Sequence, residues 1–118
     1  MFGQTLKQLV DKVDGAHGAA VLNVDGLVIE AVDATGEAVD ADTALPEYGV
    51  IIRQLVEIGG AAGMGEVGEF TVEGKDRTTV LRRLSDAYVV ALTVPPGAIL
   101  GKARFYLRVA SPDLAREL

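Results

Sequence analysis

Two apolar, β-branched runs meet at Asp25-Gly26 in the segment GAAVLNVDGLVIEAVD. An Asp-Gly dipeptide between two such runs favours a two-residue turn, because the turn needs the positive φ that this dipeptide supplies. The segment therefore predicts an antiparallel hairpin with strands over 19–24 and 27–32. The first strand is apolar at nearly every position, whereas the second contains Glu30. This difference predicts that the first strand lies in the middle of a sheet and the second nearer an edge.

Three segments have apolar residues at the spacing of three and four that is typical of an amphipathic helix. The first covers residues 2–14 and stops at Gly15. The second begins near Pro46. Its apolar stripe consists of Tyr48, Ile51, Ile52, Leu55, Ile58 and Ala62. The third starts from Gly97, and Ser111-Pro112 is expected to cap one last short turn.

Three strand-like runs follow the second helix, over 67–73, 77–84 and 87–94. The turns between them are short, so neighbouring strands must run antiparallel. The first run alternates in polarity, as an edge strand does, and the last is apolar throughout. Pairing the two wholly apolar strands at the centre predicts one α/β domain over residues 1–118, an α+β sandwich of order α-β-β-α-β-β-β-α. Its five-stranded antiparallel sheet has the order 2-1-5-4-3, with helices on both faces.

The composition excludes several classes of function. The chain has no cysteine, one histidine and a net charge of −6, which argues against disulfides and a histidine metal cluster. An acidic chain with few aromatic residues is a poor candidate for nucleic-acid binding. No apolar run approaches membrane-spanning length, and the N-terminus lacks the apolar core of a signal peptide. We therefore expect a cytoplasmic protein that holds no metal or cofactor and does not insert in a membrane.

Motifs that suggest catalysis fail on their spacing. The segment PPGAILGKA has three residues between its glycines, where a phosphate-binding loop has four, and Ala103 stands where Ser or Thr would bind magnesium. His17 has no triad spacing to Ser85 or Ser111. The glycines of GGAAGMGE match no phosphate-binding fingerprint and indicate helix termination and close approach of subunits. We therefore predict no catalytic residue and no enzymatic activity.

A helix leading into GAHGAAVLNVDGLVIEAV, an acidic connection, a small-residue-rich second helix and a final SDAYVVALTV strand occur in this order. In this arrangement the whole chain resembles the roadblock/dynein light chain family. Within that family it is most similar to the bacterial MglB/MglC-like regulators of a Ras-like small GTPase in cell polarity and gliding motility. The resemblance implies a homodimer in which the second helices pack together and the third strands pair. It also implies a helical platform for the GTPase or for another roadblock protein.

Candidate interaction residues lie on the second helix and the strand that follows it. The face opposite the apolar stripe carries the candidate partner-binding residues Glu47, Val50, Arg53, Gln54 and Glu57. This mixture of charge and exposed apolar surface is typical of a docking platform. Arg53 and Glu57 have the spacing of an exposed ion pair, and the position of Arg53 on this face suits surface contact rather than insertion beside a phosphate.

The homodimer interface is assigned to the end of this helix and the third strand. Its candidate residues are Ile58, Ala62, Phe70 and Val72. In a monomer, these residues would leave apolar surface and an unpaired strand edge exposed.

The sequence thus favours a non-enzymatic homodimeric module that binds and regulates a Ras-like small GTPase directly. Two alternatives stay open. An adaptor would bind a paralogous roadblock protein rather than the GTPase itself. A small-ligand sensor or enzyme would need a cluster of convergent polar residues, and no such cluster is evident in the sequence.

Overall fold

The computed structural model describes residues 2–25, 27–40 and 47–118. The elements within these ranges are α1 (Gly3–Lys12), β1 (Gly18–Asn23), β2 (Val28–Asp33), α2 (Glu47–Ala61), β3 (Glu69–Glu73), β4 (Thr78–Arg83), β5 (Tyr88–Val94) and α3 (Leu100–Arg116). Their order is the predicted one. The expected helix start near Pro46 and the turn glycine Gly26 lie outside the described residues.

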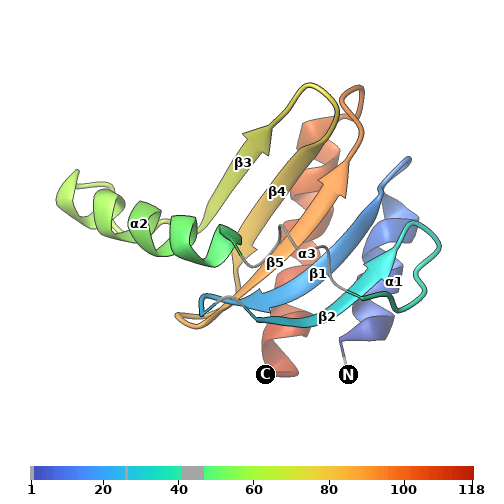
Figure 1. The fold of residues 1–118 in the computed structure, drawn as a ribbon, viewed down its shortest axis with the longest axis horizontal. Helices are drawn as coiled ribbons and strands as arrows, with labels where there is room; N and C mark the ends of the chain where they lie inside the picture. The colour runs from blue at the N-terminus through green and yellow to red at the C-terminus, as the bar shows by residue number, and fades with distance from the viewer. Residues whose placement is uncertain (1, 26, 41–46) are drawn as a thin grey trace.

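The strands form one antiparallel sheet of order β2-β1-β5-β4-β3, as the sequence predicts (Figure 1). The two wholly apolar strands, β1 and β5, lie at the centre, where both faces of the sheet need cover. The edges are β2 and β3, which carry the polar residues that the alternation indicated.

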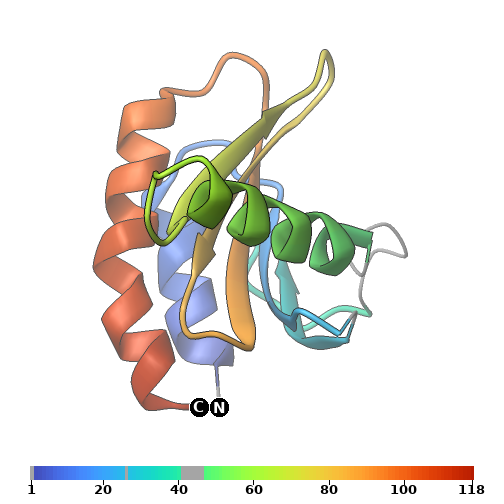
Figure 2. The same ribbon diagram turned by 90° about the vertical axis from the view of Figure 1, so that its left-hand side faces the viewer.

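Helices cover both faces of the sheet, but unequally. On one face, α1 and α3 lie side by side (Figure 2). Their core is large and includes Leu6, Leu9, Val21, Val90, Leu92, Leu107 and Leu114. On the other face, α2 covers a smaller cluster made of Leu22, Ile52, Leu81, Val89 and Ala91. The larger core therefore holds the α1 and α3 layer to the sheet.

Only the first part of α2 packs on the sheet, and the helix then runs out past the β3 edge (Figure 1). Tyr48, Ile52 and Val56 contact the smaller core. Ile51 and Ile58, which the sequence places in the same apolar stripe, are exposed. The stripe therefore divides into one strip against the sheet and a second strip in solvent.

The end of α2 is built from glycines, as the sequence indicates. The Met64 N–H donates to the Gly59 carbonyl over 2.9 Å and the Gly63 N–H to the Gly60 carbonyl over 3.3 Å. Gly63 has a φ of 74°. These two bonds and the left-handed glycine form a Schellman motif, which satisfies the last carbonyls of the helix.

Two local predictions are wrong. The predicted strand ends at 24 and 27 are one residue off, since β1 ends at Asn23 and β2 begins at Val28; the Asn23 side-chain oxygen accepts hydrogen bonds from the Asp25 and Leu27 N–H groups at this point. No new turn begins at Ser111-Pro112, since α3 continues through Pro112. Instead, the Ser111 hydroxyl donates to the Leu107 carbonyl over 2.7 Å within the helix.

Candidate interaction surface

The five candidate partner-binding residues all lie in α2. Glu47, Val50, Arg53, Gln54 and Glu57 are exposed. Val50 is the apolar member of this group and is 57% exposed. The helix thus presents to solvent the mixed charged and apolar face that the sequence predicts.

Arg53 does not pair with Glu57 in the way that its spacing suggested. Its guanidinium donates to the Asp25 carboxylate in the β1–β2 turn. Both side chains are more than half exposed. The pair therefore joins α2 to the hairpin at the protein surface, where ion pairs are weak.

The candidate dimer residues divide into an exposed and a half-buried set. Ile58 is 57% exposed, and Ala62 and Val72 are also exposed. Phe70 is half-buried, because it lies opposite Leu81 in the sheet and packs against the smaller core. Phe70 thus stabilises the protomer itself, while the other three residues remain available for contact.

Two further exposed apolar residues were not among the predicted interface residues. Ile51 is exposed one heptad before Ile58, and Met64 is exposed in the glycine-rich segment after the helix. The spacing of seven residues between the two isoleucines was the available signal, since it places them on one side of a helix. With Ile58 and Ala62, these two residues form an exposed apolar strip that runs along α2 and into the segment after it.

An ion-pair cluster holds β3 against the rest of the protein. Glu69 accepts from Arg82 on β4 over 2.8 Å and from Arg104 on α3 over 2.5 Å. Burial of Glu69 raises its pKa, but the hydrogen bonds and charges of Arg104 and Arg82 together outweigh burial and hold the pKa below its usual value. The ion pairs of Glu69 therefore anchor β3 to β4 and α3, while the other edge of β3 remains free.

Two of the polar side chains considered for catalysis have structural partners. Lys102, in the PPGAILGKA segment, lies 4.0 Å from Asp14 at ion-pair distance. Ser85 accepts the Ala87 N–H in the β4–β5 turn. Within residues 2–25, 27–40 and 47–118, no group of three metal-binding side chains gathers, and no helix is long and apolar enough to cross a membrane.

The sequence and the structure were compared with those of known proteins. No family model and no curated protein matches the sequence. Among solved structures, the chain is similar to a roadblock/LC7 domain from Streptomyces avermitilis, with a TM-score of 0.75, 18% identity, and 98% of this chain and 95% of that chain covered. The chain therefore has the roadblock/LC7 fold.

Two bacterial Mgl proteins are similar over nearly the same length. MglC from Myxococcus xanthus has a TM-score of 0.71 and 29% identity, over 99% of this chain and 98% of that chain. The gliding protein MglB from Thermus thermophilus has a TM-score of 0.74 and 19% identity, over 96% and 84%. The fold is thus roadblock/MglB-like, as the sequence resemblance implied.

Proposed function

We propose that this protein is a non-enzymatic homodimeric module of the cytoplasm that binds a Ras-like small GTPase directly and regulates it in cell polarity or gliding motility. The likeness to MglC and to a gliding protein supports this assignment. The observation that carries it is the exposure of α2, which leaves two different faces of one helix in solvent.

The two faces suit two different contacts. The exposed apolar strip of Ile51, Ile58 and Ala62 and the edge strand β3 each suit contact with a second copy of the chain. The mixed face around Val50 and Glu57 suits a charged partner surface. In a dimer, two copies of the mixed face would form one wide platform for the GTPase.

The test compares two exposed valines on opposite sides of the protein. The purified protein is used to capture partners from lysate of the source cells, and each captured GTPase or roadblock protein is then purified. Titration calorimetry measures its affinity for the parent, for Val50→Asp on α2, and for Val109→Asp on α3, which is 51% exposed. We expect Val50→Asp to weaken GTPase binding at least about tenfold, which is ~1.4 kcal/mol, while Val109→Asp leaves it unchanged.

Two results would contradict the proposal, one on the site and one on direct regulation. Equal affinity of both variants for the GTPase would move the site away from α2. Binding of a paralogous roadblock protein, with no affinity for the GTPase in either nucleotide state, would identify an adaptor instead.

A further inference from the structure

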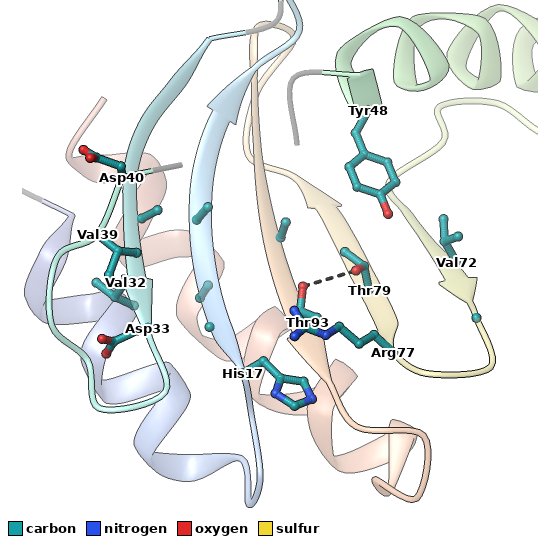
Figure 3. Close-up of a pocket in the computed structure, with 16 residues that line it drawn as sticks. His17, Val32, Asp33, Val39, Asp40, Tyr48, Val72, Arg77, Thr79 and Thr93 are labelled. Carbon is teal, nitrogen blue, oxygen red and sulfur yellow. Dashed lines mark hydrogen bonds between the residues drawn. The ribbon is translucent and has the colours of Figure 1, made fainter. Parts of the chain in front are cut away.

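A groove of about 500 Å³ lies on the α2 side of the sheet, over the end of the strands that α2 leaves uncovered (Figure 3). Its floor is made of small residues from neighbouring strands. The register places Ala20 between Ala31 on β2 and Ala91 on β5, and Gly18 continues the floor on β1. A Cβ atom at Gly18 would lie 2.6 Å from the Val32 carbonyl oxygen, so this position requires glycine.

Four polar side chains meet at one end of this groove: His17, Arg77, Thr79 and Thr93 (Figure 3). The threonines face each other across β4 and β5, with their hydroxyl oxygens 3.2 Å apart. Arg77 extends from the β3–β4 turn towards His17 (Figure 3). The groove thus has an apolar floor and one polar end, the usual division of a small-molecule site.

This end holds more hydrogen-bond donors than the protein itself uses. Two paired hydroxyls have two protons, and one of these remains for a third acceptor. Thr79 is only 8% exposed, so such a donor gains from a ligand acceptor. Among the described residues, the side chains of Arg77 and His17 make no hydrogen bond or ion pair. The planar fork of an arginine matches a carboxylate.

The acidic residues of the groove lie on its opposite wall. Asp33 is the last residue of β2, and its carboxylate accepts from the Thr35 hydroxyl over 2.6 Å and from the N–H groups of Thr35 and Glu37. Figure 3 shows the Asp33 and Asp40 carboxylates pointing away from the Arg77 end. The two acidic residues that line the groove therefore lie away from its Arg77 end.

We propose that this groove binds a small organic acid, with its carboxylate at Arg77, His17 and the threonine pair and a flat apolar body on the alanine floor. The ring of Tyr48 lines the groove above this floor (Figure 3). The volume fits a ligand of metabolite size. An apolar surface such as that around Ile58 of a second copy would instead leave the donors at this end without acceptors, which is costly. The inference goes beyond the proposed function and does not depend on it.

The test uses two aromatic probes of the same shape. Amide resonances of the ¹⁵N-labelled protein are followed by NMR during titration with 2-naphthoate and with the uncharged 2-naphthamide. We expect saturable shifts at Gly18, Ala20 and Ala91, with naphthoate binding at least about fivefold more tightly than the amide. Arg77→Gln should reduce naphthoate affinity to that of the amide. The matched control Arg108→Gln, an exposed arginine on α3, should leave it unchanged.

A second variant tests the floor. Ala31→Leu fills the groove and should abolish binding of both probes, and circular dichroism checks that the variant folds. If it does not fold, Thr79→Val takes its place and should weaken the affinity for naphthoate alone. The proposal is overturned by equal affinity for the two probes, by shifts confined to α2, or by an Arg77→Gln variant that binds like the parent. Naphthoate affinity that falls as protein concentration rises would also overturn it, because a second copy would then occupy the groove. None of these outcomes bears on GTPase binding.

Discussion

The two helical layers of this protein use apolar residues in opposite ways. Between the sheet and the α1 and α3 layer, apolar side chains are buried in a large continuous core. In the α2 layer, a small core anchors the start of the helix and further apolar side chains remain in solvent. Buried apolar surface stabilises a fold, while a contiguous exposed patch marks a contact site. The difference indicates that one layer holds the fold and the other is available for binding.

The largest expected effect contrasts one leucine from each layer. Leu107→Ala, in the fully buried core of α3, should reduce the free energy of unfolding by about 3 kcal/mol, because it leaves a cavity. Leu55→Ala, at a half-buried side chain of α2, should cost about 1 kcal/mol. Urea denaturation at one fixed protein concentration measures both. Equal losses would show that α2 belongs to the structural core and would remove the contrast.

The second prediction concerns the exposed apolar strip of α2. Ile58→Asp places a charge in the exposed apolar strip and should raise the dimer dissociation constant at least about tenfold, with little change in the protomer fold. Light scattering across a dilution series measures this, and Val72→Asp at the β3 edge should act in the same direction. Ile99→Asp is the control, since Ile99 is 73% exposed before α3. A parent protein that is monomeric at high micromolar concentration would contradict the homodimer.

How far the sequence predicts each layer follows from the kind of contact involved. Strand order and the α1 stripe depend on local periodicity, so the sequence shows them. The division of the α2 stripe depends on which side of the helix faces the sheet, and the stripe alone does not encode that orientation. The same holds for the groove, whose floor needs the register that places Ala20 beside Ala31 and Ala91.

Side-chain contacts that are distant in sequence were also beyond prediction. Arg104 and Glu69 are 35 residues apart, and Arg53 and Asp25 are 28 apart. The helical spacing suggested Glu57 as the partner of Arg53. Spacing within a helix contains no information on which distant turn lies next to that helix, so the contact with Asp25 was not predicted. The placement of candidate residues on faces was thus predictable, while their partners were not.

The third prediction concerns the anchor of β3. Glu69→Gln should cost about 1 to 2 kcal/mol, discounted because Arg104 is half-exposed. The folded-state pKa of Glu69 lies below its ordinary 4.5, so its contribution is present above pH 4.5 and is lost as the pH falls through the folded pKa. The stability gap between parent and variant should therefore close in acid. Asp113→Asn, in an exposed pair with Arg116, should show no comparable gap at any pH.

The smallest expected effect concerns the link between α2 and the hairpin. In a double-mutant cycle of Asp25→Asn and Arg53→Gln, the coupling energy should be below about 0.5 kcal/mol, because both side chains are exposed. It should vanish in 1 M salt, where screening acts within ~3 Å. A coupling above about 1 kcal/mol that resists salt would show that this pair fixes α2 to the sheet. A small coupling energy together with weaker GTPase binding by Arg53→Gln would show that Arg53 contacts the GTPase and contributes little to the fold. In that case α2 is held to the sheet by Tyr48, Ile52 and Val56.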